Sequence, residues 1–124
     1  MPTSVPDDEL ERYRATRRRR EIEHREWQCE VKQDAMQSAE RVAQFLKDRF
    51  GVERVMLFGS VAEDEVLGPR SDLDVAVKGL SAMEYYRAVA RVQSFAARGR
   101  VDLVRLEQCS PSLRRTIEEQ GIQL

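Results

Sequence analysis

The spacing of apolar and polar positions divides the sequence into a helical first part and a mixed remainder. The stretch from Asp7 to Phe50 contains neither glycine nor proline and is rich in Arg, Glu, Gln and Ala, which favours a helix. Apolar residues are sparse between Glu9 and Lys32, where opposite charges four positions apart support an exposed helix. From Ala35 onward apolar residues recur at helical spacing, so we expect that part to pack on a core.

Three short segments further along the chain predict β-strands. Residues 54–58 form an apolar run, and residues 73–78 and 100–106 alternate between apolar and polar positions. A capping box at Ser81 predicts a helix to about Ala97, and the Ser-Pro pair at 110–111 predicts a last helix that Gly121 ends. The order of elements predicts an α/β (α+β) domain, a small sheet flanked by helices.

Composition narrows the class of protein. The 124 residues suit one compact domain, and 41% apolar residues suffice for one core. The net charge of −1 argues against a general attraction to nucleic acid or membranes. No apolar run is long enough to span a bilayer, and the first residues lack the apolar segment of a secretion signal. Cys29 and Cys109 fit two free thiols, so we expect a cytoplasmic protein.

Three aspartates are the candidate metal ligands. Asp72 and Asp74 are one residue apart at the start of a predicted strand, so their side chains point to the same face. Paired carboxylates repel each other unless a cation lies between them, and such oxygen ligands suit Mg²⁺ or Mn²⁺. Asp102 lies on another predicted strand and would supply a third ligand if the two strands are neighbours. The simpler alternative is that each aspartate only faces solvent.

A glycine-serine pair follows the first predicted strand. Glycine lets backbone N–H groups approach a phosphate closely, and the hydroxyl of Ser60 adds a donor. Taken alone, Gly59-Ser60 is as readily an ordinary turn. The order of the three elements, with a Gly-Ser, an Asp-x-Asp and a later strand aspartate, makes a phosphate and metal site the better interpretation.

These motifs resemble the minimal nucleotidyltransferase (MNT) family of the DNA-polymerase-β superfamily. The resemblance rests on Phe58-Gly59-Ser60, Ser71-Asp72-Leu73-Asp74 and Val101-Asp102-Leu103-Val104, and it covers residues 35–124. It implies the polymerase-β-like fold with a small mixed sheet over residues 34–124, preceded by a charged N-terminal helical extension over residues 1–33.

The resemblance also implies roles for the site residues. Asp72 and Asp74 would bind two Mg²⁺ ions, with Mn²⁺ as an alternative, and Asp102 would bind the catalytic metal and help deprotonate the attacking hydroxyl. Gly59, Ser60 and Ser71 would bind the phosphates of ATP. The reaction implied is in-line transfer of AMP with release of pyrophosphate.

The sequence departs from the family's pattern after the Gly-Ser pair. The family's Arg-Gly is replaced by Glu63-Asp64, with Glu65 next to it, and the ten residues 61–70 exceed the usual spacing by one. Anions here disfavour a triphosphate, where a cation would favour it. Arg70 is the nearest cation that could take the place of the missing arginine.

Stand-alone MNT proteins resemble the antitoxins of HEPN/MNT toxin–antitoxin pairs, so the implied partner is a HEPN-type ribonuclease toxin that is AMPylated on tyrosine. Two alternatives remain open: a protein that masks its partner without catalysis, and a dimeric small-molecule nucleotidyltransferase. The N-terminal helix would dock on the partner or on a second copy, with Tyr13 and Trp27 buried, or else fold on its own domain. Direct binding of nucleic acid by residues 1–33 is not expected, because eight acidic residues balance eight basic ones.

Overall fold

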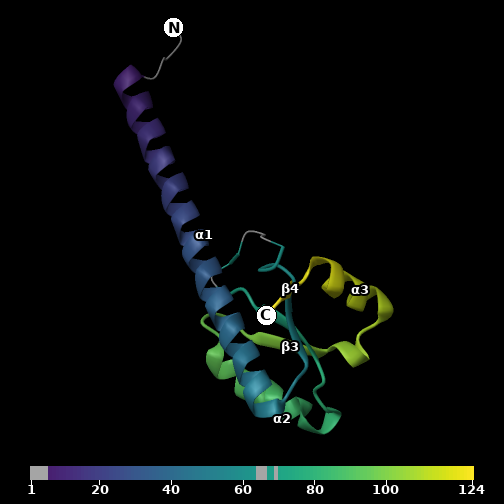
Figure 1. The fold of residues 1–124 in the computed structure, drawn as a ribbon. Helices are drawn as coiled ribbons and strands as arrows, with labels where there is room; N and C mark the ends of the chain where they lie inside the picture. The colour runs from purple at the N-terminus through teal and green to yellow at the C-terminus, as the bar shows by residue number, and fades with distance from the viewer. Residues whose placement is uncertain (1–5, 64–66, 69) are drawn as a thin grey trace. The chain divides into compact units, whose positions relative to one another are not determined.

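The computed structural model describes residues 6–63, 67, 68 and 70–124, which form a mixed sheet with helices on both faces (Figure 1). The elements in chain order are α1 (Asp7–Phe50), β1 (Arg54–Phe58), β2 (Leu73–Lys78), α2 (Ala82–Val92), the 3₁₀ turn η1 (Gln93–Phe95), β3 (Val101–Arg105), the 3₁₀ turn η2 (Leu106–Gln108), α3 (Pro111–Gln120) and β4 (Ile122–Gln123). Two compact units are distinguished, residues 1–30 and residues 31–124.

The sheet has the strand order β3-β2-β1-β4. β1 pairs antiparallel with β2 and with β4, whereas β2 and β3 are parallel and are joined through α2. This arrangement confirms the predicted α+β class and the mixed sheet. The short β4 was not predicted, because two residues are too few to show an alternating pattern.

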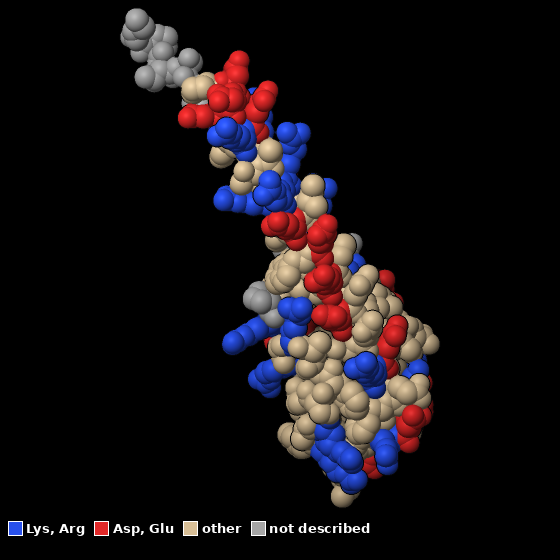
Figure 2. All heavy atoms as spheres, turned by 90° about the vertical axis from the view of Figure 1, so that its left-hand side faces the viewer, with Lys and Arg blue, Asp and Glu red and all other residues tan. Residues whose placement is uncertain are grey.

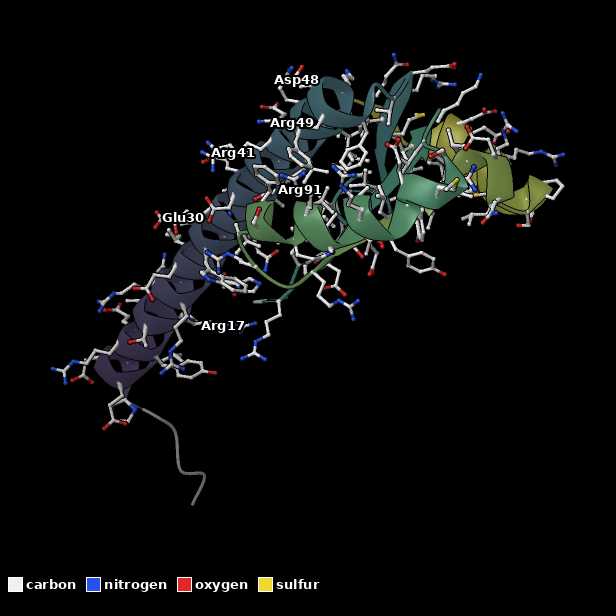
Figure 3. All side chains as sticks on the ribbon, turned by 90° about the horizontal axis from the view of Figure 1, so that it is seen from below. Arg17, Glu30, Arg41, Asp48, Arg49 and Arg91 are labelled. Carbon is white, nitrogen blue, oxygen red and sulfur yellow. The ribbon has the colours of Figure 1, made fainter. Side chains whose placement is uncertain are left out.

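Alternate residues of the strands build a core on each face of the sheet. Met56 and Ala76, which are register partners, form one buried cluster with Leu106 and with Ile117 of α3. The strand residues that alternate with Met56 and Ala76 point to the opposite face of the sheet. Two helices cover that face: α2 and the second half of α1 (Figures 1 and 3). Arg91 of α2 lies over the Phe45 ring of α1, with its guanidinium carbon 5.5 Å from the ring centroid. The sheet is therefore a middle layer, as its apolar strands predict.

The end of α2 differs from the prediction. The hydroxyl of Ser81 accepts the N–H of Glu84, as the capping box predicts, but α2 stops at Val92 and not near Ala97. The cause is Gln93, whose amide accepts the N–H of Val101 and donates to the Val101 carbonyl, as well as to a carbonyl of α2. Gln93 thus fixes the turn that leads into β3, a contact that helical spacing does not reveal.

The described residues of the first unit, 6–30, are mainly exposed, and many of them are charged. Positive and negative side chains are interspersed along it, as Figure 2 shows. Tyr13 and Ile22 are its most exposed large apolar side chains, at 64% and 51%. Burial of Tyr13 and Trp27 in an interface therefore stays a prediction. Within the described residues no helix is both long and apolar enough to cross a membrane, and both cysteines are free.

Glu107 is a carboxylate remote from the three aspartates, and its hydrogen bond at the other end of the sheet can be tested. The Gly79 N–H after β2 donates to Glu107 Oε1 over 2.7 Å. Partial burial by itself raises the pKa of Glu107, but the hydrogen bond from Gly79, its own backbone N–H and two nearby cations outweigh it, so the net pKa is lowered. A lowered pKa in the folded state adds stability above the unfolded pKa, and this stability is lost as the pH falls through the folded pKa.

We therefore expect Glu107→Gln to lower the free energy of unfolding by about 0.5 kcal/mol at pH 7, because the hydrogen bond is partly exposed to solvent. The difference from wild type should shrink below about pH 4, where both proteins carry a neutral side chain. Urea unfolding across this pH range measures it, with the exposed Glu119→Gln on α3 as control. A difference that grows toward acid pH would contradict the prediction.

Candidate functional site

The parallel pairing of β2 and β3 brings two of the three aspartates side by side. Asp74 and Asp102 are register partners, and Phe58 at the end of β1 is the partner of Asp74 on the other side. Because register partners point to the same face, both carboxylates lie on the face that α3 covers further along the strands. Asp102 is exposed and Asp74 half-buried. The condition for a third ligand, that the two strands are neighbours, is met.

Gly59 lies directly against the Asp74 carboxylate. It ends β1 with φ +77°, a left-handed conformation that favours glycine, and a Cβ there would lie 2.3 Å from Asp74 Oδ2. The N–H of Glu63 donates to the Gly59 carbonyl over 3.0 Å, which closes a helix-like turn immediately after the strand. The first N–H groups of such a turn lack partners within it and suit an anion. The Gly-Ser turn and the aspartates are thus one site.

Asp72 comes just before β2 and is held by the chain that enters β3. Its Oδ1 accepts the N–H of Arg100 over 2.8 Å, while the N–H of Leu73 donates to the Arg100 carbonyl over 2.8 Å. Among the described residues, Asp72 Oδ2 has no hydrogen-bond partner, which leaves that oxygen available to a cation. Asp72 is exposed, so its side chain is accessible from solvent.

The charges of the two neighbouring aspartates act on Asp74. Its pKa is raised, first by burial and then by the charges of Asp102 and Asp72. A divalent cation would offset this repulsion, and three carboxylates are the donor set that Mg²⁺ or Mn²⁺ prefers. As the side chains stand, the described part of the chain holds no group of three acidic, histidine or cysteine residues arranged as a metal site. The donor chemistry of the three carboxylates fits a divalent ion.

Comparison with known proteins agrees with this geometry. The profile of the family described as polymerase beta, nucleotidyltransferase matches residues 40–124, which include all three aspartates and the Gly-Ser turn. The chain belongs to this nucleotidyltransferase family. The resemblance that the sequence motifs indicated is confirmed.

Solved structures similar to this nucleotidyltransferase include toxin–antitoxin complexes. A toxin–antitoxin crystallised with AMP-PNP is 27% identical, with TM-score 0.59, over 68% of this chain and 70% of that one. A protein proposed to be a minimal nucleotidyltransferase is 32% identical, with TM-score 0.57, over 69% and 88%. A complex of tri-AMPylated Shewanella oneidensis HEPN toxin with its MNT antitoxin is 25% identical, with TM-score 0.55, over 72% and 70%. A search of the curated proteins found no significant match.

The remaining predicted phosphate ligands of the nucleotidyltransferase are placed unequally. Ser60 lies in the turn after Gly59 and is half-buried. The Ser71 hydroxyl instead accepts the N–H of Gly68 over 2.8 Å and donates to the Gly68 carbonyl, so it closes the loop before β2. Glu63 is exposed at the end of the Gly-Ser turn, and Asp64 and Glu65 lie outside the described residues. A phosphate role of Ser71 stays a prediction.

Sequence reasoning missed two arginines at this site. Arg70, Arg98 and Arg100 all line one depression beside Asp72. The sequence had singled out only Arg70, as a substitute cation for the triphosphate. The signal available was the Arg-Gly-Arg run at 98–100, directly before the strand that carries Asp102.

Proposed function

We propose that this protein is a metal-dependent adenylyltransferase that transfers AMP from ATP to a hydroxyl of a partner protein and thereby acts as an antitoxin. The observation that carries the proposal is the register of β2 and β3, which pairs Asp74 with Asp102 beside the Gly59 turn. Three carboxylates next to a phosphate-binding turn, on a nucleotidyltransferase fold, suit transfer of a nucleotide and little else.

Each residue has a role that its position supports. The N–H groups that follow Gly59 and the Ser60 hydroxyl would bind the β- and γ-phosphates of ATP. Asp72 and Asp74 would hold the divalent ions, because Asp72 has an available oxygen and Asp74 lies next to the turn. Asp102, which is exposed, would accept the proton of the attacking hydroxyl.

The bond changes are those of an in-line displacement. The acceptor oxygen bonds to the α-phosphorus of ATP, the bond from this phosphorus to the bridging oxygen breaks, and pyrophosphate leaves with the electron pair. Two bound Mg²⁺ ions, or Mn²⁺, would supply charge stabilisation to the attacking and leaving oxygens. The side chains would hold the reactants in line, which would contribute to rate through orientation.

The proposed partner is a HEPN-type toxin, with tyrosine as the acceptor. The proposal is supported by similarity to the complex in which a HEPN toxin is AMPylated, and to the toxin–antitoxin that contains AMP-PNP. The exposed helix of residues 7–30, with Tyr13 and Trp27, is the proposed docking segment for the partner or a second copy. Free cysteines fit the proposed cytoplasmic location.

The test is transfer of label from α-³²P-ATP with Mg²⁺ to the protein that co-purifies with the chain when its neighbouring gene is co-expressed. Wild type should label the partner, and an Asp72→Asn/Asp74→Asn variant that still binds the partner should not. Equal labelling by both would refute catalysis at this site. Neutralisation of the partner by both proteins without any labelling would establish the second candidate, an antitoxin that acts by binding alone.

Glu63 is the observation that favours this second candidate, and it yields a separate prediction. An anion at the end of the Gly-Ser turn repels a triphosphate, so Glu63→Arg should bind ATP about fivefold more tightly, equivalent to about 1 kcal/mol. Calorimetric titration of ATP with Mg²⁺ measures it. Glu40→Arg, an equal charge change at an exposed position of α1, serves as control and should leave the affinity unchanged. Equal gains in the two variants would show a general charge effect and contradict the prediction.

A further inference from the structure

The depression beside Asp72 is rich in positive charge. It has a volume of about 620 Å³ and lies where the loop before β2 meets the loop before β3. Its lining residues are Arg70, Asp72, Ala97, Arg98, Gly99 and Arg100. We call it the arginine pocket. Three arginines and one aspartate among these residues give the depression an excess of positive charge, which would increase if Asp72 bound a cation.

Close backbone packing fixes the shape of the arginine pocket. A Cβ at Gly99 would lie 2.6 Å from the Arg70 carbonyl and 2.7 Å from Asp72 Oδ1, so the two loops touch here. Arg98 donates to Asp34 of α1 over 3.3 Å, which anchors the second loop. Arg70 and Arg100 are exposed, and neither has an ion-pair partner among the described residues. Two of the three guanidinium groups are thus available to a ligand.

The strand order decides which reactant the arginine pocket faces. β2 carries Asp74 and lies between β1 and β3. The Gly59 turn, which would hold the leaving pyrophosphate, lies at the end of β1. In an in-line displacement the attacking and leaving oxygens lie on opposite sides of the phosphorus. The acceptor therefore enters from the β3 side, where Arg98 and Arg100 precede Asp102.

We propose that the arginine pocket binds an anionic group carried by the acceptor, and that Arg70 and Arg100 are positioning residues that align the acceptor hydroxyl with Asp102. This inference rests on the proposed function and deepens it. It assigns these arginines to the acceptor and not to the triphosphate of ATP. Guanidinium groups bind carboxylates and phosphates in the same forked geometry.

The anion has two possible sources. One is a glutamate or aspartate beside the acceptor tyrosine. The other is the phosphate of an AMP already attached to it, so that the pocket would favour a further transfer. The tri-AMPylated toxin among the similar structures supports the second source. Both sources offer the same chemistry to Arg70 and Arg100.

The experiment compares three fluorescein-labelled peptides that each contain one tyrosine: one flanked by glutamates, one flanked by glutamines, and the glutamine peptide with AMP on the tyrosine oxygen. Binding is followed by fluorescence anisotropy with Mg²⁺ and without ATP. Transfer from α-³²P-ATP then gives separate KM values for peptide and ATP. The proteins are wild type, Arg70→Gln/Arg100→Gln, the matching double lysine variant, and Arg41→Gln on the outer side of α1 as control (Figure 3).

Wild type should bind one of the anionic peptides about tenfold more tightly than the neutral peptide. Preference for the glutamate peptide identifies a carboxylate, and preference for the AMP-tyrosine peptide identifies a phosphate. The glutamine variant should lose this preference through KM for peptide, with KM for ATP unchanged, and the lysine variant should recover part of it.

Equal binding of the three peptides by wild type would overturn the proposal, as would a preference that survives in the glutamine variant. A rise in KM for ATP would overturn it too, because it would place the arginines on the triphosphate. Failure of the proposed function would give a different result: the binding preference would be present, but no peptide would be labelled.

Discussion

Replacing Asp74 by asparagine is expected to reduce AMP transfer by at least about a thousandfold, equivalent to about 4 kcal/mol in the activation barrier. Asp74 lies next to Gly59 and is the register partner of Asp102, so it stands between the Gly-Ser turn and the third aspartate. Asparagine keeps the shape and removes the charge that a divalent ion requires. The measurement is the single-turnover rate with saturating ATP and Mg²⁺.

The same substitution should stabilise the protein when no metal is present. Because burial and two neighbouring carboxylates raise the pKa of Asp74, its ionised form is disfavoured in the folded state. Asp74→Asn should therefore melt at a higher temperature than wild type in EDTA, and Mg²⁺ should raise the melting temperature of wild type only. Asp48→Asn, on the outer side of α1 (Figure 3), should change neither rate nor melting temperature, because the asparagine oxygen can still accept the hydrogen bond from Gln44. A less stable and fully active Asp74→Asn would contradict both statements.

Gly59→Ala is expected to lower transfer by about a hundredfold and to destabilise the fold. The new Cβ would lie 2.3 Å from Asp74 Oδ2, so either the carboxylate or the turn after β1 has to move. A displacement of about 1 Å at a reacting centre costs roughly a hundredfold in rate. The φ of +77° adds about 1–2 kcal/mol of backbone strain for any residue with a Cβ.

Gly51 offers a matched control for this substitution. It has φ +62°, close to that of Gly59, but a Cβ there meets nothing within 4 Å. Gly51→Ala should therefore show the backbone strain alone, with full activity per folded molecule. The difference between the two variants, measured by urea unfolding and by transfer rate, isolates the contact with Asp74. Equal loss of activity in both would show that the contact does not matter.

The strands were predictable because their patterns are local. Residues 73–78 and 101–105 show the alternation of a sheet with a buried face, and the structure makes strands of both. The helix from Asp7 to Phe50 followed in the same way from the absence of glycine and proline. The strand β4 was not predictable because Ile122 pairs with Leu57, which is distant in sequence. The end of α2 was not predictable because the hydrogen bonds of Gln93 to Val101 leave no trace in the helical spacing.

The candidate site was predictable in its residue types and not in its arrangement. The motifs indicate Asp72, Asp74 and Asp102 as ligands, but only the register of β2 and β3 pairs Asp74 with Asp102. The contact of Asp72 with the Arg100 N–H depends on the meeting of two loops that are separate in sequence. The arginine pocket was missed for the same reason, since its arginines gather only in the folded chain.

The strand order also bears on how the chain folds. Asp74 and Asp102 are 28 positions apart (102 − 74), whereas the β1–β4 partners Met56 and Gln123 are 67 apart (123 − 56). Closing the longer loop costs about 0.8 kcal/mol more, so β2, α2 and β3 are expected to associate before β4 docks. If the carboxylates meet during folding, their repulsion is expected to slow refolding. Mg²⁺ should then accelerate refolding in stopped-flow measurements. If Mg²⁺ changed only the unfolding rate, the carboxylates would come together after the folding transition state. Under the first outcome, the divalent ion proposed for the reaction would also set how fast newly made chains fold.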